Sequence, residues 1–172
     1  RRGWSTGQIH PSSFQGPALY AQICTSFPII FLMDLSIIIP SYNTKKLLDR
    51  CLSSVEESLI GTALLYEIIV VDNASTDGTA ELLNTKYTRV IKIFNEKNIG
   101  YGKANNQGIQ KAKSRFILLL NSDIEVIDRG VEMLYTFASS HSRSFVGGKL
   151  FNVDGTPQSS CGPAFSIPVV AL

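Results

Sequence analysis

The sequence predicts an α/β protein with a mainly parallel central sheet, and three observations support this prediction. Two apolar runs, at residues 35–39 and 68–71, stop abruptly in small polar residues, and a third, at 116–120, is wholly apolar. Such runs are typical of parallel strands that are buried on both faces. Segments with helical spacing separate them, and alternating strands and helices form right-handed parallel crossovers. We therefore expect the polar residues after the strands to meet at one sheet edge, where these folds bind ligands.

The first two strands each precede a predicted helix. Apolar residues recur at helical spacing over 47–59, with Asn43 as the expected N-cap and the helix end near Gly61. After the second strand, Thr76 or Asp77 is the expected cap of a short helix. Strand, helix, strand and helix in this order predict a right-handed crossover.

The second half continues this alternation and then changes. A third strand is expected at 90–94. The helix after it carries small residues on one face, which allow close packing on the sheet: Ala104, Gly108 and Ala112. After the fourth strand, Asp128 is the expected cap of a helix over 131–138. A strand at 145–151 and a turn signal at 153–156 then predict a β-hairpin.

Composition places the chain among globular proteins with a substantial core. Of the 172 residues, 44% are hydrophobic and 17% are charged, which fits one domain. The formal net charge of +2 is too small, and the 16 Lys and Arg residues are too dispersed, to indicate a nucleic acid partner. Cys24, Cys51 and Cys161 lie far apart and indicate neither a disulfide framework nor a zinc site. We expect a reducing, cytoplasmic location.

Residues 1–32 differ from the rest of the chain. Gly, Ser, Pro and Gln are scattered in them without periodicity, and Met33 stands directly before the first strand. We expect an irregular leader that is non-native or translated from an upstream start, with the folded domain spanning 33–172. The apolar stretch 27–32 contains Pro28 and is far shorter than the ~20 residues that cross a bilayer.

Two strand ends carry candidate ligand-binding groups. Asp72 ends an apolar strand, where a carboxylate needs a hydrogen-bond donor or a cation, and a base N–H or a ribose hydroxyl would supply the donor. Asp72 could instead bond the backbone of its own loop. At the end of the first strand, Pro40 turns the chain out of the sheet. The ring of Tyr42 could stack on a base or pack on the following helix.

The string from Asn98 to Gly108 indicates a phosphate-binding helix start. Its glycines allow close backbone approach, and the first N–H groups of the helix after Gly102 can face a diphosphate, with Lys103 as a nearby cation. A dinucleotide-binding motif is excluded, because the third glycine is missing and the string follows the third strand rather than the first.

Together these strings resemble family-2 glycosyltransferases of the GT-A fold, which transfer a sugar from a nucleotide donor. The resemblance covers residues 33–165 and includes Asn121-Ser122-Asp123, which stands where the family has its Asp-x-Asp metal motif. It implies a Rossmann-like three-layer sandwich, here truncated at its C-terminus. Residues 146–162 are similar to the stretch after this motif in bacterial rhamnosyltransferase-type members, which points to dTDP-rhamnose as the donor.

The resemblance also implies the site residues. Asp123 would bind Mg²⁺ or Mn²⁺, hard cations that prefer carboxylate and phosphate oxygens. Asn121 replaces the first carboxylate of the motif, so the metal would also depend on the donor phosphates. The nucleotide sugar would contact the remaining candidates: Pro40, Ser41, Tyr42, Asn43, Asp72, Asn73, Ser75, Gly100, Gly102, Lys103, Asn106, Asn121 and Ser122.

The implied function is inverting transfer of a sugar from a nucleoside diphosphate to a polysaccharide or lipid-linked acceptor. In this family a later acidic motif carries the general base, and no Asp or Glu follows Asp154. We therefore expect the base beyond Leu172, and this chain to be the donor-binding half with little transfer activity of its own. A lipid-linked acceptor would bring the protein to the inner face of the plasma membrane.

Two other functions remain open from the sequence. A non-catalytic nucleotide-binding module would keep the same residues without turnover. A sugar-1-phosphate nucleotidyltransferase shares the sheet topology. It should have a glycine-rich phosphate loop directly after the first strand, whereas residues 41–45 are Ser-Tyr-Asn-Thr-Lys.

Overall fold

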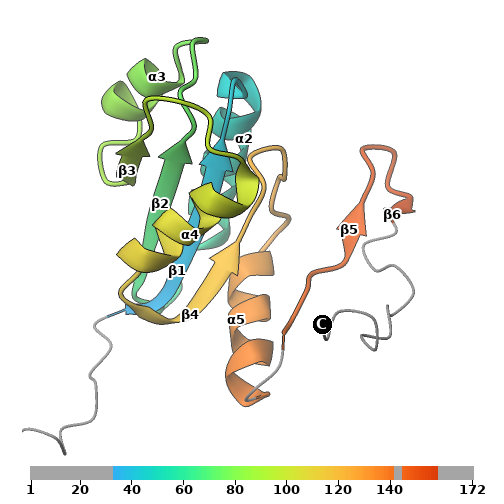
Figure 1. The fold of residues 1–172 in the computed structure, drawn as a ribbon. Helices are drawn as coiled ribbons and strands as arrows, with labels where there is room; N and C mark the ends of the chain where they lie inside the picture. Colours follow the sequence, from blue (N-terminus) through green and yellow to red (C-terminus); the bar gives the residue numbers. More distant parts are fainter. Residues whose placement is uncertain (1–32, 142–144, 159–172) are drawn as a thin grey trace, which may run out of the picture. The chain divides into compact units, whose positions relative to one another are not determined.

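The computed structural model describes residues 33–141 and 145–158, and Figure 1 shows their path. The predicted leader, residues 1–32, lies outside the described residues. Four strands form one sheet in the order β3-β2-β1-β4, and each neighbouring pair is parallel, as predicted. Their bounds are Met33–Ser41 for β1, Tyr66–Asp72 for β2, Ile91–Phe94 for β3 and Ser114–Leu119 for β4.

Strand β1 occupies the middle of the sheet because its apolar run suits burial on both faces. Ile37, Ile38 and Ile39 are fully buried, although successive side chains of a strand point to opposite faces. β1 pairs with β2 along one edge and with β4 along the other. The middle of β1 is thus enclosed by protein on all sides.

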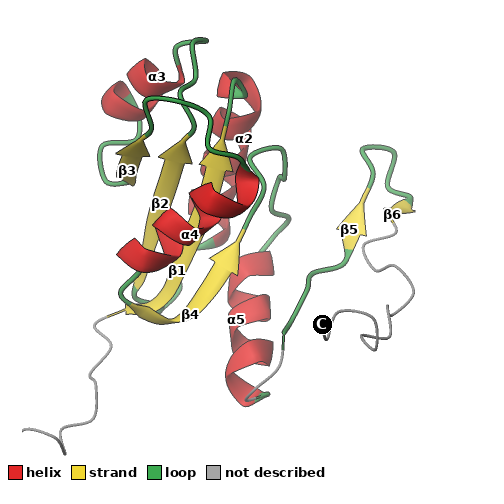
Figure 2. Cartoon of the chain, viewed as in Figure 1, coloured by secondary structure: helices red, strands yellow, loops and turns green. Residues whose placement is uncertain are grey.

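Helices cover both faces of the sheet (Figure 2). They are α2 (Lys45–Ser58), α3 (Thr79–Thr85), α4 (Tyr101–Lys111) and α5 (Gly130–Ser140). Ile37 and Ile39 belong to a core shared with α2, α3 and α5, whereas Ile38 packs in a separate core with Ala104 of α4. None of the described helices is both long enough and apolar enough to cross a membrane. The expected three-layer arrangement is confirmed.

Helix α4 packs closely on β1 through Gly108, in agreement with the predicted small-residue face. A Cβ atom added at Gly108 would collide with Cγ2 of the buried Ile38. Ala104, one turn earlier, is fully buried in the same core. The short separation of helix and sheet therefore requires glycine at position 108.

The predicted cap of the first helix is wrong. α2 begins at Lys45, and the preceding residue, Thr44, makes no side-chain capping bond. Asn43 lies one residue further out with a φ of 53°, and its Oδ1 accepts a hydrogen bond from the Thr76 N–H at 2.8 Å. The Asn43 side chain therefore joins two loops instead of capping a helix.

The caps of the later helices also differ from the prediction. α3 begins after Gly78, whose φ is 86°, although Oδ1 of Asp77 still accepts a hydrogen bond from the Thr79 N–H at 3.1 Å. α5 begins after Arg129, so Asp128, with a φ of 51°, is not its cap. Left-handed backbone at Gly78 and Asp128 changes where each helix begins, and the residue types alone did not indicate it.

The predicted β-hairpin is confirmed and is shorter than expected. β5 (Leu150–Phe151) and β6 (Pro157–Gln158) pair antiparallel in a sheet of their own. In the turn, Oδ1 of Asp154 accepts hydrogen bonds from both the N–H and the hydroxyl of Thr156. The expected strand is limited to its last two residues.

Strand β4 forms one edge of the described sheet and is partly uncovered. Ile117 and Leu119 pair in register with Ser36 and Ile38, so they lie on the α4 side. They are nevertheless 42% and 47% exposed. The described part of α4 thus covers β1 and leaves apolar side chains of β4 in solvent.

Replacing Gly108 with alanine is expected to destabilise the domain, although alanine has the higher helix propensity. The added methyl group would force Ile38 or α4 to move, which costs about 1–3 kcal/mol in the free energy of unfolding. Gly102→Ala in the same helix is the matched control, because outside its chain neighbours and the backbone of its own helix no described atom lies within 4 Å of the added group. It should be neutral or stabilising by up to about 1 kcal/mol. Urea denaturation measures both variants, and wild-type stability of Gly108→Ala would contradict the close packing.

Candidate functional site

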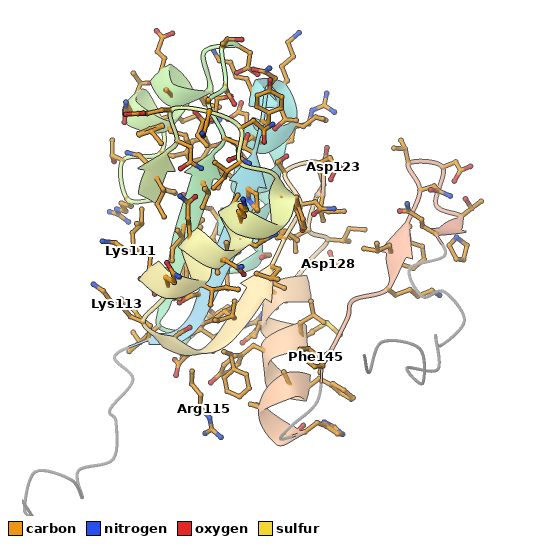
Figure 3. All side chains as sticks on the ribbon, in the orientation of Figure 1. Lys111, Lys113, Arg115, Asp123, Asp128 and Phe145 are labelled. Atoms are coloured by element: carbon orange, nitrogen blue, oxygen red, sulfur yellow. The ribbon has the colours of Figure 1, made fainter. Side chains whose placement is uncertain are left out.

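The polar ends of β1, β2 and β4 meet in a cleft of about 340 Å³ at the carboxyl edge of the sheet. Figure 3 shows Asp123 at this edge, beyond the arrowhead of β4. The cleft brings together these sequence-predicted residues: Pro40, Ser41, Tyr42, Asn73, Asn121, Ser122 and Asp123. Further residues line it that were not predicted as ligands: Thr44, Leu47, Asn98 and Tyr101. Residues far apart in the sequence thus share one cleft.

The other predicted candidates do not line this cleft: Asn43, Asp72, Ser75, Gly100, Gly102, Lys103 and Asn106. On α4, Lys103 and Asn106 are exposed, whereas the neighbouring Asn105 is buried and its Nδ2 donates to the Tyr101 carbonyl at 3.2 Å. The sequence string identified the helix, but α4 begins at Tyr101, after Gly100, and not after Gly102 as predicted. The helical phase then directs Asn105, and not Asn106, into the protein.

Two loops at the rim of the cleft, β1–α2 and β2–α3, are joined by hydrogen bonds. The N–H of Asn43 donates to Oγ of Ser75 at 2.8 Å, and Oδ1 of Asn43 accepts from the Thr76 N–H at 2.8 Å. The N–H of Lys45 donates to Oδ2 of Asp77, also at 2.8 Å. Asn43 and Ser75 thus stabilise the shape of the rim through bonds within the protein.

Asp72 is 3% exposed at the end of β2, beside Asn73 of the cleft. Its Oδ2 accepts a long hydrogen bond of 3.4 Å from the Ser75 N–H, and its Oδ1 has no hydrogen-bond partner among the described residues. A buried carboxylate oxygen without a donor is unfavourable, so an N–H or hydroxyl group of a ligand would stabilise it. The hydrogen bond within its own loop satisfies Oδ2 of Asp72, and Oδ1 remains without a donor among the described residues.

An amide network holds Asn73 in position. Nδ2 of Asn95 donates to Oδ1 of Asn73 at 2.9 Å, and Asn95 and Gln107 exchange two further bonds of 2.9 Å. The N–H of Asn95 also donates to the Asp72 carbonyl at 2.8 Å. The network connects the end of β2 with α4, so this side of the cleft is held by more than one element.

Exposure alternates along the segment Asn121-Ser122-Asp123. Ser122 is buried, and its Oγ lies 3.0 Å from Oγ1 of Thr44, which lies 2.9 Å from Oγ of Ser41. Asn121 and Asp123 are exposed in the cleft. The Ser122 hydroxyl therefore anchors the segment to the β1–α2 loop and leaves its two neighbours accessible to a ligand.

Cys51 of α2 lies beneath this segment. Its thiol donates a hydrogen bond to the Asn121 carbonyl at 3.5 Å. Burial raises the pKa of the Cys51 thiol to about 12, and the negative charges of Asp123 and Glu125 act in the same direction. Cys51 is therefore a protonated core residue, and its thiol is not activated as a nucleophile.

The cleft presents oxygen atoms that suit a hard divalent cation. Asp123 supplies an exposed carboxylate. Within 33–141 and 145–158, no group of three His, Cys, Asp or Glu side chains could hold a metal ion. The Asp123 carboxylate can hold Mg²⁺ or Mn²⁺ when a bound ligand supplies further oxygens, as a diphosphate does.

The chain matches a family model and several curated proteins, including two bacterial glycosyltransferases. The model, described as glycosyl transferase family 2, matches residues 36–159. Poly(ribitol-phosphate) β-glucosyltransferase of Bacillus spizizenii is 34% identical over 127 residues, which cover 72% of this chain and 20% of that protein. Glycosyltransferase GlyG of Streptococcus pneumoniae is 34% identical over 123 residues, which cover 70% of this chain and 40% of that protein. The chain thus spans less than half the length of these relatives.

A solved structure supports the same fold. The crystal structure of S. aureus TarS matches with a TM-score of 0.55 and 25% sequence identity, over 63% of this chain and 20% of that chain. Its partial coverage agrees with the lengths of the curated relatives. The expected GT-A architecture is confirmed by the family model together with this match.

Replacing Asp77 with alanine is expected to lower the free energy of unfolding by about 1 kcal/mol at pH 7. Burial raises the pKa of Asp77, but hydrogen bonds from the Thr79 hydroxyl and from the N–H groups of Lys45 and Thr79 outweigh it and lower the pKa below its ordinary value. The stabilisation is therefore present above the unfolded-state pKa of about 3.9 and is lost as the pH falls through the folded-state pKa. Urea denaturation between pH 7 and pH 3 measures this loss.

Asp154→Ala is the matched control for this prediction. Asp154 accepts hydrogen bonds from the N–H and hydroxyl of Thr156, as Asp77 does from Thr79, but Asp77 also accepts a bond from the N–H of Lys45 at the start of α2. The control should leave the unfolding of the parallel sheet unchanged. An equal loss of stability in both variants would argue against a role for Asp77 in joining the loops.

Cys51 is expected to resist alkylation in the folded protein. With a pKa of about 12, its thiolate fraction at pH 8 is on the order of 10⁻⁴, and its side chain is buried. Iodoacetamide labelling, mapped by peptide mass spectrometry, should modify Cys51 only after guanidinium is added. Rapid labelling of Cys51 without denaturant would contradict its burial.

Proposed function

Because the chain belongs to glycosyl transferase family 2, we propose that it forms the donor-binding part of an enzyme that transfers a sugar from a nucleoside diphosphate to an acceptor hydroxyl. The observation that carries the proposal is the composition of the cleft and its border. An exposed aromatic ring, a buried carboxylate with a free oxygen and an exposed carboxylate come from the ends of three different strands. These groups suit a base, a ribose and a cation-bridged diphosphate.

In this proposal the nucleoside lies over the ends of β1 and β2. The ring of Tyr42, which is 49% exposed, stacks on the base beside Pro40. The unpartnered Oδ1 of Asp72 accepts a hydrogen bond from the base or the ribose, and Asn73 contributes its amide. This hydrogen bond would remove the free-energy cost of a buried oxygen that has no donor.

The diphosphate lies between the end of β4 and the start of α4. A helix leaves its first N–H groups unpaired, and those after Gly100 can bond phosphate oxygens, with Lys103 as a nearby cation. Asp123 would hold Mg²⁺ or Mn²⁺ together with the phosphates. Bound there, the cation neutralises the charge that develops on the leaving diphosphate.

The proposed transfer is inverting. The acceptor hydroxyl attacks the anomeric carbon in one displacement and gives its proton to a carboxylate base. In the cleft of the described residues, the exposed carboxylate is Asp123, which is assigned to the cation. The relatives extend well beyond the matched region, and we place the base in such a further part of the protein, beyond Leu172.

For the acceptor we propose a cell-surface polymer or its lipid-linked precursor. The B. spizizenii relative is a poly(ribitol-phosphate) β-glucosyltransferase, and this name supports a polymeric acceptor. A lipid-linked precursor would place the protein in the cytoplasm, at the inner face of the plasma membrane. For the donor, the similarity of residues 146–162 to rhamnosyltransferase-type members supports dTDP-rhamnose, whereas the relative's name supports a glucosyl donor.

Nucleoside diphosphates are expected to raise the melting temperature of the full chain in a metal-dependent way. A ligand at a hundred times its Kd adds about 2.7 kcal/mol, or roughly 5–10 °C for a domain of this size. Melts with dTDP, UDP and GDP, each with and without Mn²⁺, identify the preferred base. Asp123→Ala should abolish the metal-dependent part of the shift.

Asp128→Ala is the matched control, since Asp128 is an exposed carboxylate close in sequence that does not line the cleft (Figure 3). Its nucleotide shift should equal that of the wild type. A cooperative melt that no nucleotide changes, with or without Mn²⁺, would contradict the proposed donor site. Turnover of a nucleotide sugar by a longer form of the protein separates an enzyme from a nucleotide-binding module.

A further inference from the structure

Tyr101 and Asn121 meet across the cleft, although sequence reasoning assigned no role to Tyr101. Tyr101 is the first residue of α4, and its hydroxyl donates a hydrogen bond to Oδ1 of Asn121 at 2.7 Å. Both residues line the cleft, and Tyr101 is 56% exposed. A large aromatic side chain in solvent adds little to stability, so the position of its hydroxyl calls for another explanation.

The contact decides which atom of Asn121 faces a ligand. A carboxamide has one oxygen, which accepts hydrogen bonds, and one NH₂ group, which donates them. Because Oδ1 is engaged by Tyr101, Nδ2 points the other way, and it makes no hydrogen bond to the described residues. The backbone of Asn121 is held separately, since its carbonyl accepts the Cys51 thiol and the Ile124 N–H.

On the basis of the proposed function, we infer that Tyr101 is a positioning residue that orients Asn121 for the bound nucleotide. Tyr101 fixes the carboxamide so that Nδ2 donates a hydrogen bond to an oxygen of the nucleoside diphosphate. Asn121 then acts as a hydrogen-bond donor, and Asp123 alone supplies the carboxylate for the cation. The start of α4 and the segment after β4 are thereby coupled through one side-chain contact.

Tyr101 could have one of three roles in binding. If its ring only forms a wall of the cleft, removing the hydroxyl changes nothing. If the hydroxyl bonds the ligand directly, its loss weakens binding whether or not Asn121 is present. If the hydroxyl acts through Asn121, its loss matters only while the carboxamide is there.

A double-mutant cycle tests these alternatives. The dissociation constant of the nucleoside diphosphate that gives the largest melting shift is measured by calorimetry with Mn²⁺, for the wild type, Tyr101→Phe, Asn121→Ala and the double variant. We expect Tyr101→Phe to weaken binding about fivefold and Asn121→Ala by about as much or more. In the Asn121→Ala background, Tyr101→Phe should have no further effect.

Two controls support the interpretation. Tyr135→Phe removes a hydroxyl from α5, outside the cleft, and should leave the dissociation constant unchanged. The melting temperatures of the unliganded site variants should stay close to that of the wild type, because Tyr101 and Asn121 are exposed.

An Asn121→Asp variant provides a second readout. It keeps an acceptor for Tyr101, loses the NH₂ group and adds a carboxylate beside Asp123. It should bind Mn²⁺ alone more tightly and bind the nucleotide without Mn²⁺ more weakly. Unchanged metal-free nucleotide binding would overturn the assignment of Asn121 as a donor.

The outcomes separate this inference from the proposed function. Equal effects of Tyr101→Phe in both backgrounds, or no effect in either, would overturn the positioning role while nucleotide binding by the wild type still supports the donor site. A wild-type chain that binds none of the three nucleotides would overturn both.

Discussion

Burial of β1 on both faces and both edges holds the sheet in a single register. A slip of one residue would exchange the isoleucines between the two cores, moving Ile38 away from α4 and Gly108. In the observed register Ser41 lies beside Asp72, and Asp72 lies beside Phe94. The strands β1, β2 and β3 therefore end side by side, and the polar loops that follow them begin at the same edge of the sheet. The shape of the cleft therefore depends on the single register of β1.

Hydrogen bonds, and not ion pairs, hold the groups around the cleft. The Thr44 and Ser122 hydroxyls join one pair of segments, and the Asn95 and Gln107 amides join another. The ion pairs of the described residues, such as Lys86 with Asp49, lie at the surface, where solvent screens them. Ionic strength should therefore act on the charge of a ligand and leave the shape of the cleft intact.

The strands and helices could be predicted because their apolar patterns are local, whereas several site contacts could not. Asn43 has the composition of a helix cap, yet its partners lie in a loop more than thirty positions away. The choice between Asn105 and Asn106 depends on the phase of α4, which a string of neighbouring polar residues does not determine. Tyr101 lies twenty positions from its partner Asn121, and a tyrosine after a glycine carries no signal of that contact. The position of Tyr101 at the expected start of a helix, near the strand ends, was the one sign in the sequence that it could line the cleft.

The exposed side chains of β4 have a consequence for how this chain behaves in solution. β4 pairs with β1 along one edge, and no described strand pairs with its other edge. Backbone donors and acceptors without partners, next to Ile117 and Leu119, form a template onto which another extended chain can add. Self-association through β4 would then increase with protein concentration. A polypeptide that pairs with the open edge of β4 would prevent it. The segment that follows β4 lines the cleft, while the strand itself forms an open edge of the described sheet.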